Sequence, residues 1–103
     1  METQPYKLID LVSYQDGSVV SRTLVNRKAG TLTLFAFDAG QSLSEHTAPF
    51  DAVAQILDGE AEITIAEQPF HLRAGETIIM PANQPHAVNA IQRFKMLLTM
   101  IKE

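Results

Sequence analysis

Short segments of alternating apolar and polar residues run through most of the chain. In Glu60–Ile65 the odd positions are apolar and the even positions polar, which is the period-two pattern of a half-buried strand. A last strand has one apolar face made of four alternating residues, Phe94, Met96, Leu98 and Met100. Its other face is partly apolar too, through Leu97 and Ile101, which predicts a strand that is covered on both sides.

Turn residues separate these segments at short intervals. The Gly, Pro, Asn and Asp clusters lie at residues 16–17, 26–30, 38–40, 58–59, 67–69, 74–75 and 83–85. No window carries a 3.6-residue apolar stripe longer than two turns. The pattern therefore predicts an all-β sandwich or barrel of about ten short antiparallel strands. Asp58-Gly59 is the strongest hairpin signal, because Asp-Gly suits a type I′ turn between Val53–Leu57 and Glu60–Ile65.

The length of 103 residues fits one domain, residues 1–103. There is no Cys, so no disulfide can stabilise so small a chain, and a reducing compartment is favoured. Pairing with a second copy would supply extra burial, and we expect a homodimer. Tyr6–Val12 is the candidate contact segment, because it is too apolar for a free tail.

The charges exclude some partners. The formal net charge is -4, and the longest basic run is the pair Arg27-Lys28, so a nucleic-acid-binding face is not expected. The apolar runs are far shorter than the roughly 20 residues of a membrane span. The N-terminal residues lack a charged region followed by an apolar one, which is the pattern of a secretory signal. We expect a cytoplasmic protein.

Two segments, residues 40–59 and 75–90, resemble the two sequence motifs of the cupins, and above all the small single-domain cupins with a conserved, RmlC-like jelly-roll barrel. The matching residues are Gly40, His46 and Gly59 in the first motif and Gly75, Pro81 and His86 in the second. Four motif positions differ: Ala48 replaces a His, Ala52 a Glu, Asn83 a Gly and Ala90 an Asn. The resemblance implies a double-stranded β-helix of two antiparallel sheets.

Metal-binding cupins hold one divalent ion with three His and one Glu, and only His46 and His86 match here. The resemblance therefore implies at most a weakly bound transition metal (Zn, Ni or Fe), since imidazole suits these ions and two ligands hold them loosely. Alternatively, the two imidazoles only satisfy backbone carbonyls or waters, or they anchor a polar group of a small ligand. The residues expected to line the barrel pocket are His46, Ala48, Ala52, Met80, His86, Phe94 and Met96.

Other residues suggest less chemistry. His71 is expected on the surface, strand alternation points Asp51 to the wrong face, and Glu60 and Glu62 share a solvated face. Ser44 has no acid partner at triad spacing, and neither a Cys nucleophile nor a Gly-rich phosphate loop is present.

We therefore expect a small-molecule-binding cupin. The alternative is a metal-dependent isomerase, decarboxylase or dioxygenase acting on a small organic acid or sugar. A regulatory partner of a separate DNA-binding protein is a third possibility.

Overall fold

The computed structural model describes residues 1–103 as eight strands and one short 3-10 helix. In chain order these elements are η1 (Leu8–Asp10), β1 (Val19–Arg27), β2 (Gly30–Phe37), β3 (Ser42–His46), β4 (Asp51–Ile65), β5 (Gln68–Arg73), β6 (Thr77–Met80), β7 (His86–Asn89) and β8 (Phe94–Ile101). Every pairing between strands is antiparallel. The expectation of an all-β fold made of antiparallel strands is confirmed, with eight strands in place of about ten.

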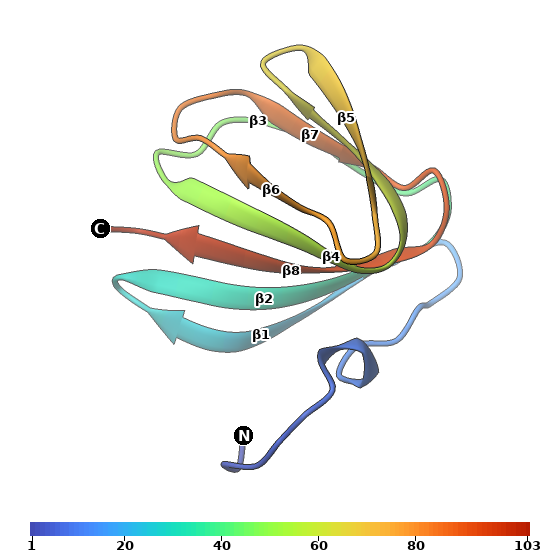
Figure 1. The fold of residues 1–103 in the computed structure, drawn as a ribbon, viewed down its shortest axis with the longest axis vertical. Coiled ribbons are helices and arrows are strands. Elements are labelled where there is room, and N and C mark those ends of the chain that lie inside the picture. Colours follow the sequence, from blue (N-terminus) through green and yellow to red (C-terminus); the bar gives the residue numbers. More distant parts are fainter.

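The strands form two faces of one curled barrel (Figure 1). One sheet has the order β1-β2-β8-β4-β6, and the other has the order β3-β7-β4-β5. Strand β4 belongs to both, because its first half pairs with β6 and β8 and its second half with β5 and β7. Strands β5 and β6 each pair only with β4, so the barrel has an unpaired seam between them.

The prediction of a hairpin at Asp58-Gly59 is wrong. Residues 51–65 form one continuous strand, which bends at a bulge between Ile56 and Asp58. Gly59 has φ of 75°, and a Cβ atom there would lie 1.7 Å from the Arg93 carbonyl oxygen. Only glycine tolerates both conditions, so the Asp-Gly pair bends β4 from one sheet into the other. The hairpin itself falls at Ala66 and Glu67, with φ of 48° and 71°.

The inner core lies between the two sheets and consists of twelve buried residues. Its largest members include Phe37 and Phe94, whose rings stack with centroids 4.5 Å apart. Ala54 and Ala61 on β4 are fully buried beside them. Small residues on the strand shared by both sheets let large side chains from the other strands fill the space, as close packing requires.

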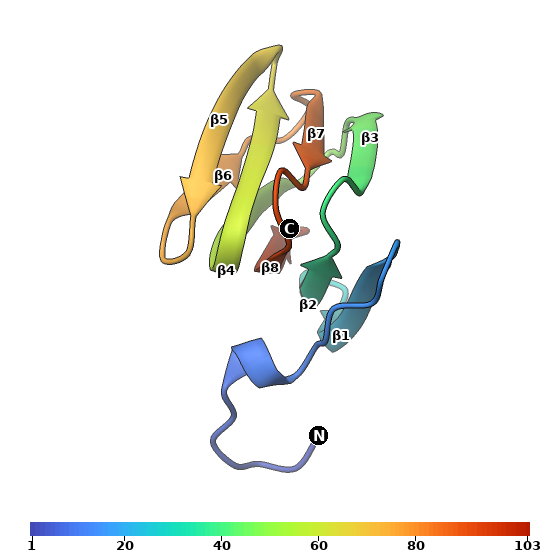
Figure 2. The ribbon, with the colours of Figure 1, turned by 90° about the vertical axis from the view of Figure 1, so that its right-hand side faces the viewer.

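A second apolar cluster, the outer core, lies on the opposite face of the β1-β2-β8 sheet. Leu34, Ala36 and Leu97 are buried there against Val12. Figures 1 and 2 show the N-terminal segment (blue) running beneath β1, β2 and β8, on the side away from β3 and β7. The burial of Leu97 shows that β8 is covered on both faces at this position, whereas Ile101 at the end of the same face is 49% exposed.

The N-terminal segment is held by polar contacts as well. The Ile9 carbonyl oxygen accepts a hydrogen bond from the Lys95 ammonium group at 2.7 Å. The Leu11 carbonyl oxygen accepts one from the Arg22 guanidinium group at 3.2 Å. Tyr14 donates to the Asp58 carboxylate at 2.6 Å, and burial together with this bond raises the pKa of Tyr14 well above its usual range. Within Tyr6–Val12, residues Leu8, Leu11 and Val12 therefore pack within their own chain, which accounts for their apolar character without a partner.

A further polar cluster ties the loop before β8 to the start of the domain. Arg93 bonds Asp16 at 2.6 Å and Asp38 at 2.7 Å. The hydrogen bond from Arg93 and the backbone N–H of Gly17 hold the pKa of Asp38 below its usual range.

No helix in the structure is long and apolar enough to cross a membrane.

Candidate functional site

His46 and His86 meet at one end of the barrel. His46 ends β3, His86 begins β7, and the two are directly paired in the register of these strands. Their Nε2 atoms lie 3.1 Å apart, and the rings meet edge to face with centroids 4.3 Å apart. We expected both histidines to lie inside the barrel. His86 is buried whereas His46 is exposed, so the pair lies at the mouth of the barrel.

The register of β3 explains why His46 faces His86. From Leu43 to His46 β3 advances three residues, while the partner strand β7 advances two, from Val88 to His86. Without this irregularity, strand alternation would turn His46 to the face opposite Leu43, which packs on the inner core. The extra residue is a bulge that returns the imidazole to the inner face.

Both imidazoles are oriented by the backbone. The Nδ1 atom of His46 lies 2.8 Å from the Ser44 carbonyl oxygen, and that of His86 lies 3.2 Å from the Gln84 carbonyl oxygen. A carbonyl oxygen only accepts hydrogen bonds, so each Nδ1 must carry the proton. In the neutral rings each Nε2 then has a lone pair, and the two lone pairs converge at 3.1 Å. This contact is satisfied by one proton shared between the two nitrogens, or by a metal ion or a ligand donor placed at both of them.

The donor set fits two cis ligands of one transition metal. With metal–nitrogen bonds of about 2.0–2.1 Å, an Nε2–Nε2 separation of 3.1 Å corresponds to an angle at the metal of about 100°. The Nδ1–carbonyl bonds are the outer contacts that fix the orientation of metal-binding histidines.

The rest of a metal shell is missing from the side chains. Ala48 and Ala52 stand at two ligand positions, and no group of three or more His, Cys, Asp or Glu gathers anywhere in the structure. Asp51 is directed elsewhere, because its carboxylate accepts the backbone N–H of Ala82 at 2.8 Å. Two imidazoles are therefore all that the side chains supply.

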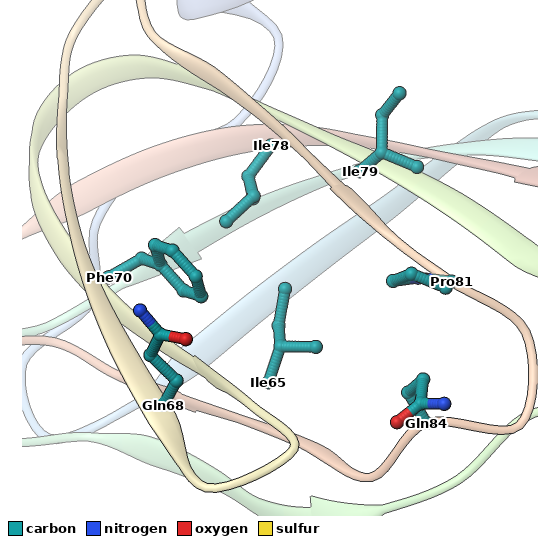
Figure 3. A pocket seen from close by; sticks show the side chains of 7 residues that line it. All are labelled: Ile65, Gln68, Phe70, Ile78, Ile79, Pro81 and Gln84. Atoms are coloured by element: carbon teal, nitrogen blue, oxygen red, sulfur yellow. The ribbon is translucent and has the colours of Figure 1, made fainter.

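Four of the expected pocket residues do not line a cavity. Ala52, Met80, Phe94 and Met96 are buried members of the inner core, because the side chains packed around them fill the barrel. The cavity that the structure contains lies at the seam between β5 and β6 and measures about 430 Å³. It is lined by Ile65, Gln68, Phe70, Ile78, Ile79, Pro81 and Gln84 (Figure 3). None of the expected residues is among these.

The hydroxyl of Thr31 is a polar group that sequence reasoning missed. Thr31 shares the inner face of β2 with Phe35 and Phe37, and its Oγ1 is buried without a hydrogen-bond partner. A buried unpaired hydroxyl costs free energy, which marks it as a group that a bound molecule or water could satisfy. The alternation of Thr31 and Thr33 with Leu32 and Leu34 is the signal that could have revealed it.

The remaining candidates have structural roles. His71 is exposed and pairs with Glu60 at 3.1 Å, while Arg73 lies 3.4 Å from the same carboxylate. Glu60 thus forms an ion pair on the outer face of its sheet. Ser44 contributes its backbone carbonyl oxygen to the hydrogen bond with His46 Nδ1.

The fold and site together define a class: single-domain antiparallel barrels with a histidine site at the mouth. The family model of the cupin domain matches residues 33–101. The chain belongs to the cupin family.

Three solved structures illustrate this relationship. A conserved protein of unknown function from Streptococcus pyogenes is 39% identical, with a TM-score of 0.95 over 100% of this chain and 90% of that one. A cupin superfamily protein from Desulfitobacterium hafniense is 31% identical, with a TM-score of 0.94 over 100% and 94% of the two chains. A cupin 2 conserved barrel domain protein from Leptotrichia buccalis is 41% identical, with a TM-score of 0.92. The match covers 94% of this chain but only 47% of that protein. No match was found among curated proteins.

Proposed function

We propose that this cupin binds a small molecule at the barrel mouth, with the polar head of the molecule at His46 and His86. The observation that carries the proposal is the convergence of two Nε2 lone pairs at 3.1 Å, with both Nδ1 protons committed to carbonyl oxygens. A ligand amine with two N–H groups or a weakly held divalent metal satisfies both lone pairs at once, and a ligand hydroxyl shares its single proton between them in a bifurcated bond.

The metal in this proposal is weak because the two imidazoles are its only side-chain ligands. Zn, Ni and Fe suit imidazole, whereas Mg and Ca prefer oxygen ligands. A metal-dependent isomerase, decarboxylase or dioxygenase is the alternative function. It would require the ligands that Ala48 and Ala52 do not supply.

The proposal is tested by titrating Ni²⁺ into protein purified without an affinity tag, followed through the histidine ring signals in NMR spectra. We expect weak, rapidly exchanging binding, and because Ni²⁺ is paramagnetic it should broaden and shift the ring signals of His46 and His86 and leave that of His71 sharp. His46→Ala should weaken it at least roughly ten-fold, because one of two ligands is lost. His71→Ala is the matched control, since it removes a histidine from the outer face and should leave binding unchanged. Unaffected ring signals would rule out a metal at the pair and leave only the ligand donor, and one equivalent bound at nanomolar affinity would reveal ligands beyond the pair.

We also propose a homodimer formed through the outer face of the β6-β4-β8-β2-β1 sheet. The N-terminal segment covers only part of this face, and an apolar strip beside the outer core is open to solvent: Val25 (38% exposed), Ile79 (62%) and Ile101 (49%). The outer face of the other sheet carries Glu60, Glu62 and His71 instead. A strip continuous with the outer core suits a second copy, which would extend that core across the two chains.

A further inference from the structure

The cavity at the seam between β5 and β6 has an uncharged, mostly apolar lining. Ile65, Phe70 and Ile78 point toward the same space (Figure 3). No charged side chain lines the cavity, and its polar lining comes from the amides of Gln68 and Gln84. Its volume of about 430 Å³ lies near the lower end of the range of small-molecule pockets. Such a lining favours an apolar group of the size of one ring.

The cavity adjoins the histidine pair through a single residue. Ile65 pairs with Gln68 on one side and with His86 on the other, and His86 pairs with His46. These four residues therefore form one row across the sheet, and directly paired residues point to the same face. At about 4.8 Å per strand interval, Gln68 lies roughly 10 Å from His86 along this row.

A backbone contact also links the two places. Gln84 lines the cavity with its side chain, and its carbonyl oxygen accepts the Nδ1 proton of His86. The loop that bounds one end of the cavity thus also orients the imidazole.

We infer that the cavity holds the apolar tail of the same ligand whose polar head lies at the histidine pair. The ligand class is an amphipathic small molecule with a hydroxyl or amine head, a short linker that crosses Ile65, and an uncharged ring-sized tail. This inference rests on the proposed function, because the head is placed by the histidines. The tail is placed by the cavity alone, which lets the two be tested separately.

Three probes separate head from tail in two-dimensional NMR titrations: toluene as a tail, propan-1-ol as a head, and 3-phenylpropan-1-ol as both. We expect toluene to shift the signals of Ile65, Phe70 and Ile78 and to leave the His46 ring signals unchanged. The joined probe should bind at least roughly ten-fold more tightly than either fragment, because the second contact becomes intramolecular.

Variants then assign each half of the ligand. Ile78→Trp fills the cavity and should weaken toluene and the joined probe at least ten-fold, while Ni²⁺ binding at the histidine pair stays unchanged. Phe70→Ala, at a half-exposed position on an edge strand, is the second variant, and it should weaken the same two probes without filling the space. Ile91→Ala, at a 51% exposed position between β7 and β8 and away from both the cavity and the proposed dimer face, is the control and should bind all three probes as the wild type does.

Two results would overturn the inference. One is the absence of toluene-induced shifts at the cavity, and the other is equal affinity of the wild type and both cavity variants for 3-phenylpropan-1-ol. Failure of the proposed function gives a different result: His46→Ala would then leave both the joined probe and Ni²⁺ unaffected, while toluene binding at the cavity would persist.

Discussion

Replacing Gly59 with alanine tests the account of how one strand serves both sheets. Gly59 has φ of 75°, and its added Cβ would lie 1.7 Å from the Arg93 carbonyl oxygen and 2.9 Å from the Phe94 Cα. The positive φ alone costs an alanine about 1–2 kcal/mol. The overlap with backbone atoms forces β4 and β8 apart, which costs roughly another 1–3 kcal/mol by comparison with overpacked sites.

Gly17→Ala is the matched control. Gly17 has φ of 67°, close to that of Gly59, but a Cβ there would meet no atom within 4 Å. The control therefore carries the dihedral cost without the overlap. We expect it to lower the free energy of unfolding by about 1–2 kcal/mol and Gly59→Ala by roughly 2–5 kcal/mol.

Urea unfolding followed by circular dichroism measures both values under the same conditions. A loss of about 2–5 kcal/mol is a large part of the stability of a small domain, so Gly59→Ala should unfold at clearly lower urea. Equal losses in the two variants would refute the reasoning, because the close approach of β8 to Gly59 would then have no energetic consequence.

Three further predictions concern the site, the charges and the assembly. Ala48→His combined with Ala52→Glu should tighten Ni²⁺ binding at least roughly ten-fold over the wild type in a calorimetric titration, and no gain would mean that these positions do not face the histidine pair. The pKa of Asp38 is lowered in the folded protein, so its stabilising contribution is present above the unfolded pKa of about 3.9 and is lost as the pH falls through the folded value. Asp38→Asn should therefore lower the free energy of unfolding at neutral pH and have a shrinking effect below about pH 4, whereas an effect independent of pH would contradict the pairing with Arg93. Light scattering at micromolar concentration should report a dimer for the wild type and a monomer for Ile101→Lys, and a monomeric wild type would count against the outer-face interface.

Much of the fold could be predicted from the sequence, because period-two alternation is a local property. The segments around Glu60–Ile65 and Phe94–Met100 are strands as expected. Gly59 shows the limit of local reasoning. Asp-Gly is compatible with a tight turn and with a bulge, and only the strands that pair on each side of Gly59 decide between them.

The histidine pair was indicated by motif spacing, but its geometry was not. Counting from Leu43, alternation would place His46 on the wrong face, and the bulge against β7 corrects this. The convergence of the two Nε2 atoms depends in turn on carbonyl oxygens of Ser44 and Gln84, whose positions follow from backbone conformation and not from residue identity.

The cavity was decided by tertiary structure alone. Its lining comes from β4, β5, β6 and the loop before β7, and it lies where two edge strands fail to pair. Met80, Phe94 and Met96 looked equally suited to line a pocket, but they are buried members of the packed inner core. Outside bulges such as the one before His46, the sequence by itself determined which residues turn inward, because each strand alternates on its own. Whether an inward residue meets a neighbour or an open space depends on how closely the two sheets approach at that point, which is a property of the assembled barrel.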